Sequence, residues 1–148
     1  MPAKGSLIAR GSYILIMRNR HNLELEVGKL GRVQFERGYY VYVGSGLGGV
    51  YQRARRHMRR DKKKYWHIDY LTPEYMSIKR IYIIRSGQSI EEILAQKIEK
   101  TSCSAVVGFG SSDSPLASHL FFFASPPHRK KSFMDIVHDF KAENMNLH

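Results

Sequence analysis

Cysteine is nearly absent from this sequence, and long apolar stretches are missing altogether. The single cysteine, Cys103, cannot form a disulfide within the chain, which favours a reducing compartment and leads us to expect a cytoplasmic location. No apolar run approaches the roughly 20 residues that a membrane-spanning helix needs. The first residues also lack the charged segment and apolar core of a signal peptide, so we expect none. These absences argue against a disulfide-rich secreted protein and against a membrane protein.

Acidic residues are scarce as well, with 13 Asp and Glu against 24 Lys and Arg, and the formal net charge is +11. The excess is concentrated in residues 53–64, where eight basic side chains stand beside one acidic one, for a local charge of +7. Such a cluster is typical of a protein that binds the phosphate backbone of nucleic acid. A solvated helix face would normally alternate its charges, and a membrane-surface helix needs an apolar face that this segment lacks. We therefore predict a nucleic-acid partner, DNA favoured over RNA, contacted by Arg55, Arg56, Arg59, Arg60, Lys62, Lys63 and Lys64.

The length of 148 residues, of which 43% are hydrophobic, suits one folded domain with one modest core. Stretches rich in β-branched and aromatic residues alternate with segments of helical periodicity, which predicts an α+β domain over residues 1–148. The expected strands are 11–17, 39–44, 79–85 and 120–123, with an extra β-hairpin at 23–36. The expected helices are 49–60, 89–100 and a C-terminal helix over about 132–144 that Ser132 caps. Both faces of the 11–17 strand are mostly apolar, so we expect it in the centre of a sheet.

Residues 39–57 are the stretch around which the rest of the chain is organised. They are expected to form a strand, a glycine-rich turn over 44–49 and a basic helix. Tyr40 and Tyr42 share one face of the strand, and Arg53 and His57, four residues apart, share one face of the helix. A tyrosine at the strand end and an Arg-x-x-x-His helix face should therefore converge on one spot.

Several motifs in this chain resemble those of the GIY-YIG nucleases. Gly11-Ser12-Tyr13 is similar to the first half of the signature, and Tyr42-Val43-Gly44 is similar to the second half. Arg53 and His57 match the Arg-x-x-x-His of the helix that follows the signature. The runs Trp66 to Leu71 and Phe109 to Phe121 resemble further motifs of the small, stand-alone Uri-type subfamily. Together these motifs cover about residues 11–123, in the order that the family has.

The resemblance implies a small antiparallel β-sheet flanked by helices and a metal-dependent endonuclease that cleaves DNA with Mg²⁺ or Mn²⁺. Repair or processing of DNA are its candidate roles. In GIY-YIG enzymes the two signature tyrosines lie beside the metal and the water, and one is thought to act as the base. These roles would fall on Tyr13 and Tyr42. A tyrosine base requires that nearby cations lower its pKa from about 10, which Arg53 and the metal could do.

Other candidate site residues follow from chemistry and from the same resemblance. The planar guanidinium of Arg53 can hold phosphate oxygens, and His57 can shuttle a proton or bind phosphate because histidine titrates near neutral pH. The family's metal ligand is a glutamate on a later helix, so Glu91 and Glu92 are both candidates. Ser89 and Glu92 have the spacing of a capping box, and Glu91 lies four residues before Ala95, as in the subfamily pattern. Both arguments choose Glu91.

The resemblance also suggests that His67, Asp69, Asp113 and His119 line the site, with roles left open. His67 and Asp69 would share a face if residues 65–70 were extended. The histidines and Asp69 lack the close ligand spacing of structural zinc sites. The chain departs from the family where Ser12 stands in place of isoleucine, and where the hairpin widens the spacing from Tyr13 to Tyr42 to 29 positions.

Two further functions remain open on the same fold. The chain could be a nucleic-acid-binding module, for DNA or RNA, that does not cleave its ligand. It could also be a structural subunit of a larger repair or RNA assembly, since relatives of the subfamily are sometimes fused to an endonuclease III-type repair domain. Glu91 distinguishes the enzyme from the binding module, because a protein that only binds phosphates has no use for a carboxylate beside them.

Overall fold

The computed structural model describes residues 10–46, 48–110 and 118–147. Within these residues, an antiparallel six-stranded sheet has the strand order β6-β7-β4-β1-β5-β8. Its strands are β1 (Gly11–Asn19), β4 (Gly38–Gly46), β5 (Ser77–Arg85), β6 (Ser104–Ala105), β7 (Leu120–Phe123) and β8 (Glu143–Asn144). The helices are α2 (Val50–Arg56), α3 (Glu91–Glu99) and α4 (Lys131–Asp139). The prediction of an α+β fold with a small antiparallel sheet flanked by helices is confirmed.

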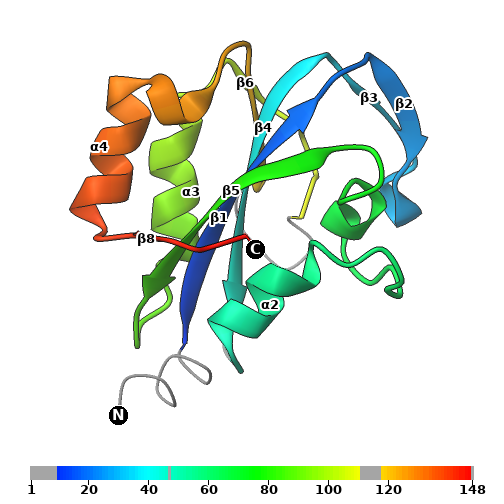
Figure 1. Ribbon diagram of the computed structural model, residues 1–148. Helices are drawn as coiled ribbons and strands as arrows, with labels where there is room; N and C mark the ends of the chain where they lie inside the picture. Colours follow the sequence, from blue (N-terminus) through cyan, green and yellow to red (C-terminus); the bar gives the residue numbers. More distant parts are fainter. Residues whose placement is uncertain (1–9, 47, 111–117, 148) are drawn as a thin grey trace.

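The two faces of the sheet are covered by different elements, as Figure 1 shows: α3 and α4 lie on one side and α2 on the other. Side chains of β1 alternate between these faces. Tyr13, Leu15 and Met17 pack on the α2 side, whereas Ile14 and Ile16 pack on the side of α3 and α4. All of them are buried, because β1 lies between β4 and β5 and both faces are covered. The expected central position of this strand is confirmed.

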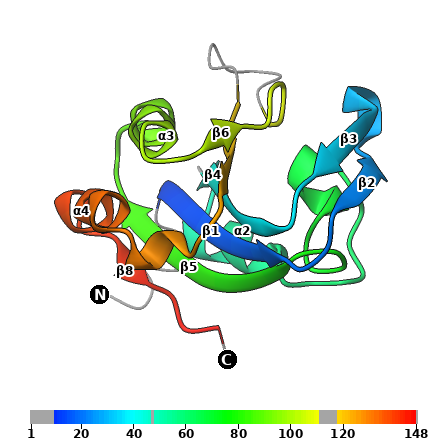
Figure 2. The same cartoon turned by 90° about the horizontal axis from the view of Figure 1, so that it is seen from above.

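The predicted hairpin is also present, as a separate two-stranded sheet of β2 (Leu23–Glu26) and β3 (Arg32–Phe35). A short 3₁₀ helix, η1 (Gly28–Leu30), connects the two strands. The hairpin extends away from the main sheet on the side opposite α3 and α4 (Figure 2). Its apolar side chains at Leu25 and Val33 pack on the core. The insertion between the two signature halves therefore adds to the core without interrupting the pairing of β1 with β4.

The helices differ from the sequence expectation at their ends. Helix α2 ends at Arg56 and not near residue 60. Val50 and Ala54 are fully buried, but the next residue of the apolar stripe, Met58, is 36% exposed. The core therefore supports only the first part of the segment, and the like charges that follow do not extend the helix.

Two expected helix caps are absent. The N-cap of α3 is Ile90, which makes no side-chain capping hydrogen bond, so Ser89 and Glu92 do not form a capping box. The N-cap of α4 is Lys130, which places Ser132 inside the helix and not at its cap. In both cases the buried apolar stripe determines where the helix begins, and the local capping signal does not. Among the described residues no helix is long and apolar enough to cross a membrane.

Candidate functional site

A cleft of about 440 Å³ opens where the end of β4 meets α2, the start of α3 and the 3₁₀ helix η2 (His67–Tyr70). Its walls include Tyr42, Gly44, Arg53, Trp66, His67 and Glu91. Tyr42 and Gly44 come from β4, Arg53 from α2 and Glu91 from the first position of α3. Residues that are far apart in the sequence therefore surround one cleft, as the expected convergence of the strand end with the basic helix requires.

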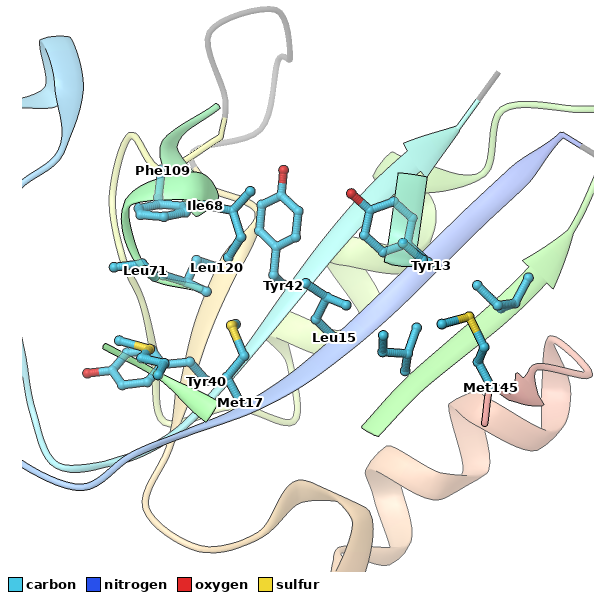
Figure 3. Close-up of a cluster of buried hydrophobic side chains, with 14 of the residues drawn as sticks. Tyr13, Leu15, Met17, Tyr40, Tyr42, Ile68, Leu71, Phe109, Leu120 and Met145 are labelled. Atoms are coloured by element: carbon cyan, nitrogen blue, oxygen red, sulfur yellow. The ribbon is translucent and has the colours of Figure 1, made fainter. Parts of the chain in front are cut away.

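Tyr13 lies directly beneath the wall of this cleft. It is 1% exposed, and its ring lies against Gly44. A side chain on Gly44 would place its Cβ 2.4 Å from the Tyr13 ring and 2.5 Å from its hydroxyl oxygen. Figure 3 shows the hydroxyls of Tyr13 and Tyr42 at the same end of the core cluster, pointing away from Leu15. The absence of a side chain at Gly44 therefore brings the Tyr13 hydroxyl to the boundary of the cleft.

Tyr13, Tyr42 and His57 form one buried cluster of rings. The Tyr13 hydroxyl forms a 2.6 Å hydrogen bond with Nε2 of His57. The centroid of the Tyr42 ring lies 6.3 Å from that of Tyr13 and 6.0 Å from that of His57. His57 is fully buried. It reaches the site through Tyr13 and does not present its ring at the surface for contact with phosphate.

Burial and the charge of Arg53 act in opposite directions on the pKa values of both tyrosines. Burial, followed by the neighbouring Tyr42, raises the pKa of Tyr13 well above its usual value, and Arg53 offsets only part of this increase. Burial, followed by the charge of Glu91, also raises the pKa of Tyr42, again against a lowering effect of Arg53. The loss of hydration thus outweighs the nearby cation, because a phenolate is poorly stabilised in a buried site. Arg53 by itself therefore does not bring the pKa of either tyrosine below its usual value.

Burial, together with the charges of Lys62, Arg56 and Arg53 and against an opposing effect of Asp69, lowers the pKa of His57 to about 3. His57 is therefore neutral at pH 7. Tyr13 is also neutral, so their hydrogen bond joins two uncharged groups. Nδ1 of His57 is buried and has no hydrogen-bond partner among the described residues. Nε2 of His57 can therefore accept the phenol proton as the phenol oxygen takes up another, so that no free phenolate forms.

Arg53 is held at the cleft by Trp66. The Cζ atom of Arg53 lies 4.0 Å from the centroid of the Trp66 ring, and Cζ of Arg56 lies 4.5 Å from the same ring. Nε of Arg53 is buried without a hydrogen-bond partner among the described residues. Stacking on the indole fixes the plane of the guanidinium while leaving N–H donors available for an anion. The Arg53 guanidinium can thus donate hydrogen bonds to an anion in the cleft.

Asp69 supports this arrangement from behind the cleft. One carboxylate oxygen accepts a 2.7 Å hydrogen bond from Nη1 of Arg56, and the other accepts bonds from the backbone N–H groups of Tyr65 and Trp66. Burial raises the pKa of Asp69, but the bonds from Arg56, Trp66 and Tyr65 outweigh it, so the net pKa is lowered. Residues 67–70 form a 3₁₀ helix, so the extended conformation considered for 65–70 does not occur. His67 consequently lines the cleft, whereas Asp69 anchors the segment.

Glu91, the predicted metal ligand, faces the cleft from the start of α3, and its side chain is 24% exposed. Its Oε2 atom lies 3.2 Å from Nδ1 of His119, which is almost fully buried. Both ring nitrogens of His119 lack a hydrogen bond of good geometry among the described residues. His119 therefore lies beside the Glu91 carboxylate without a well-formed hydrogen bond to it. Asp113 lies outside the described residues.

His67 and Gly110 close the other side of the cleft. The backbone N–H of Gly110 donates a 2.9 Å hydrogen bond to Nδ1 of His67. Gly110 has a φ of 68°, which favours glycine, and a Cβ there would lie 3.3 Å from the Tyr42 ring. Burial lowers the pKa of His67. Because Nδ1 of His67 accepts a hydrogen bond from the backbone N–H of Gly110, this side of the cleft is lined by a neutral imidazole.

In the basic segment, residues 53–64, some side chains are exposed and others form hydrogen bonds or ion pairs within the protein. Arg55, Arg59, Arg60, Lys63 and Lys64 are exposed. Arg56 instead binds Asp69 and donates a 2.6 Å hydrogen bond to the carbonyl of Lys63. Lys62 donates hydrogen bonds to the backbone carbonyls of His57, Arg59 and Thr72. The surface available for phosphate contacts is therefore smaller than the sequence suggested, and Arg56 and Lys62 organise the segment itself.

The family described as a domain of unknown function, DUF123, matches residues 12–142 of the sequence. The chain belongs to the DUF123 family. No curated protein and no solved structure matches it. The DUF123 match extends from β1 past the end of α4, so it includes every cleft residue named above.

Trp66 and Tyr65 are the residues of this DUF123 chain whose importance sequence reasoning missed. Both line the cleft, and Trp66 is the platform on which Arg53 and Arg56 stack. A signal was available, because Trp66 is the only tryptophan of the chain and follows a run of basic residues. Tryptophan is the preferred partner of guanidinium groups among aromatic residues.

Proposed function

We propose that this DUF123 chain is a metal-dependent endonuclease of the GIY-YIG type, similar to the Uri-type enzymes, that hydrolyses phosphodiester bonds in DNA. The proposal is supported above all by the convergence of Tyr42, Arg53 and Glu91 on one cleft, with Tyr13 and His57 directly beneath it. These are the positions that match the signature motifs. We further propose that it acts in DNA repair or processing in the cytoplasm, with a repair protein as its candidate partner.

Arg53 would bind the scissile phosphate. Its guanidinium can donate two parallel hydrogen bonds to phosphate oxygens, and the charge that develops there in the transition state strengthens them. Stacking on Trp66 keeps the group oriented before the substrate arrives. A preorganised donor of this kind contributes more than a mobile one, because little reorganisation is needed during the reaction.

Tyr13 and His57 would handle the proton of the attacking water. As the water oxygen forms its bond to phosphorus, its proton passes to the Tyr13 oxygen while the Tyr13 proton moves to Nε2 of His57. The bond from phosphorus to the leaving oxygen breaks, and that oxygen takes up a proton from solvent water in the open cleft. This relay avoids a buried phenolate, which the raised pKa of Tyr13 disfavours. A bound phosphate raises the pKa of His57 and so favours its protonation. The Tyr42 hydroxyl, at the wall of the cleft, would orient the water.

Glu91 would hold the divalent ion, Mg²⁺ or Mn²⁺. The described residues contain no group of three or more His, Cys, Asp or Glu side chains that could hold a metal. A metal site made entirely of protein ligands, such as a structural zinc site, therefore does not fit there. A single carboxylate at an open cleft does suit Mg²⁺, which keeps most of its waters. When bound, the ion would stabilise negative charge on the phosphate and lower the pKa of a bound water. His119 would keep the Glu91 carboxylate turned toward the cleft.

DNA would reach the cleft along the exposed basic residues that follow α2. Arg55, Arg59 and Lys63 are exposed, and the segment has few acids to offset them. Contacts of this kind bind phosphates without reading bases. Tyr65 is 71% exposed beside the cleft and offers a ring on which an unpaired base can stack.

A plasmid-nicking assay on matched variants tests the proposal. Nicking should require Mg²⁺ or Mn²⁺ and should be lost in Glu91→Ala, whereas Glu92→Ala, which removes the same charge one residue further along α3, should keep it. DNA affinity of Glu91→Ala should be equal or slightly higher, because a negative charge near the phosphates is gone. If the wild-type protein nicks no DNA with any divalent ion, the endonuclease is refuted. If Glu92→Ala is the inactive variant, the metal ligand is wrong by one position.

A nucleic-acid-binding module is the second candidate, and one observation favours it. Burial raises the pKa of Tyr13 and of Tyr42, so neither is ionised at neutral pH and ready to accept a proton as a phenolate. The same basic surface would then bind DNA or structured RNA without cleaving it. In that case Glu91→Ala should change only affinity, and structured RNA incubated in parallel with the plasmid should bind while both remain intact.

A further inference from the structure

A second cleft, of about 630 Å³, lies between the start of β5, the 3₁₀ helix η3 (Pro127–Arg129) and strand β8. Tyr39, at the beginning of β4, forms part of its wall. Tyr39 packs with the core cluster on the α3 and α4 side, whereas Tyr42 of the first cleft packs on the α2 side. Arg80, another wall residue, pairs with Ile16, which also faces the α4 side. Met145 and Leu147, which also line it, pack with the cluster on the α2 side, so the second cleft lies at the edge of the sheet formed by β5 and β8.

Positive charge is concentrated in this second cleft. Lys79, Arg80, His128 and Arg129 line it, and no acidic residue does so among the described residues. None of these four has a carboxylate partner in the described part of the chain, whereas Arg32, Arg56, Arg85 and Lys131 each have one. Cationic groups gathered in a concave site without counter-charges favour the binding of an anion.

The ring of His128 provides a second observation at the same place. Its Nδ1 atom is buried and has no hydrogen-bond partner in the described residues. Burial lowers the pKa of His128, and the charges of Arg80 and Arg129 lower it further, which shows that both guanidiniums lie near the ring. An anion among these groups would offset the repulsion and could accept a hydrogen bond from the ring.

Neighbouring basic residues have other partners, which separates the cleft from a general basic surface. The sequence continues as Lys130 and Lys131 after His128 and Arg129. Nζ of Lys130 donates a 2.6 Å hydrogen bond to the carbonyl of Thr101, and Lys131 pairs with Asp135. Only the first half of this basic run therefore lines the cleft.

We propose that the second cleft binds the phosphate group of a nucleotide, either free or within a nucleic-acid strand. Its volume lies in the range of small-molecule sites, roughly 300–1,000 Å³. The cations would hold the phosphate, Tyr39 offers an aromatic wall for a base, and Asn144 offers an amide for its polar edge. This site goes beyond the proposed endonuclease, because it shares no wall residue with the first cleft and needs no cleavage.

The test is a titration without divalent ions, with AMP and separately with a short oligothymidylate, followed by NMR signals of the His128 ring. The His128→Gln variant identifies those signals by their loss. We expect a saturable shift in the wild-type protein. The half-saturating concentration should rise by at least about tenfold in the double variant Arg80→Gln, Arg129→Gln, the scale of losing one hydrogen bond to a charged group. The control is the double variant Lys97→Gln, Lys100→Gln, which removes two charges from exposed positions of α3 and its C-cap. It should leave the half-saturating concentration unchanged.

The two ligands and the control variant distinguish the outcomes. A response to AMP supports a site for free nucleotides, and a response to the oligothymidylate alone supports a site for a strand. If neither ligand shifts the His128 signals, or if the control variant weakens binding equally, the proposal is overturned. If the double variant does not fold, Arg129→Gln alone, at an exposed position, carries the same prediction. If the proposed endonuclease function is wrong, the nicking assay shows it independently, because that assay does not depend on His128.

Discussion

The Tyr13 hydroxyl is hydrogen-bonded to Nε2 of His57 beneath a glycine that has no room for a side chain. Gly44→Ala would place its Cβ 2.4 Å from the Tyr13 ring and force the ring to move. We expect a loss of about 1–3 kcal/mol in the free energy of unfolding, the usual cost of overpacking, together with loss of nicking. Gly48→Ala is the matched control, since a Cβ at Gly48 has nothing within 4 Å. Chemical denaturation and the nicking assay measure both effects, and equal effects of the two variants would contradict this account.

His57 should make the stability of the protein depend on pH. Burial lowers its pKa from 6.5 to about 3, so below pH 6.5 the unfolded chain takes up a proton that the folded chain does not bind. The free energy of unfolding therefore falls as the pH decreases from 6.5 toward 3, by about 2 kcal/mol at pH 5.

Denaturation curves between pH 7 and pH 4 test this dependence. His57→Gln should be less stable than the wild type at pH 7 but should lose less stability on acidification. His21→Gln, at an exposed position, should keep the wild-type slope. A slope that is the same in all three proteins would mean that His57 is protonated in the folded state.

The segment that carries Trp66 is held in place by the ion pair of Arg56 with Asp69, which forms only in the folded chain. Asp69 accepts hydrogen bonds from Arg56 and from two backbone N–H groups, and these hold the segment that carries Trp66. The spacing of Arg56 and Asp69 in the sequence gives no sign of this pairing. The resemblance drew attention to Asp69 as a site residue, but its anchoring role follows from the tertiary structure.

Asp69→Asn should therefore lower the free energy of unfolding substantially. It leaves the Arg56 guanidinium, 19% exposed, without its carboxylate, and breaking such a pair costs about 3 kcal/mol. Asp135→Asn breaks the exposed pair with Lys131 and should cost less than about 1 kcal/mol. Thermal or chemical denaturation compares the two variants. Because Trp66 holds Arg53, Asp69→Asn should also reduce nicking under conditions in which it remains folded.

Long elements with a strong apolar pattern could be predicted from the sequence, whereas short ones could not. The apolar alternation of β1 and β5 and the stripe of Phe133, Ile136 and Val137 in α4 marked these elements correctly. Strands β6 and β8 have two residues each and form only because β7 and β5 offer edges for pairing. The capping signal at Ser89 was misleading for the same reason, since tertiary packing set the start of α3.

At the scale of the whole molecule, the motifs named residues that the structure brings together, but they did not predict the electrostatics of these residues. Tyr13, Tyr42, Arg53, His57 and Glu91 do gather at one cleft, because β1 and β4 pair and α2 follows directly. The depth at which each group lies was not readable from the sequence. Burial decides the pKa of Tyr13 and of His57, and burial depends on all the elements that cover them.

The net charge of the molecule, +11, leads to the last prediction, on salt dependence. The exposed residues Arg55, Arg59 and Lys63 should contact phosphates, and each contact contributes roughly −0.9 to the slope of log affinity against log salt on duplex DNA. Replacing all three by serine should make the slope less negative, by up to about 2.7. The control replaces Lys29, Lys97 and Lys100, also exposed, and should change the slope little. Fluorescence anisotropy with a labelled duplex at several salt concentrations measures both. If the two triple variants have the same slope, DNA binds through the overall charge and not through the basic segment beside the cleft.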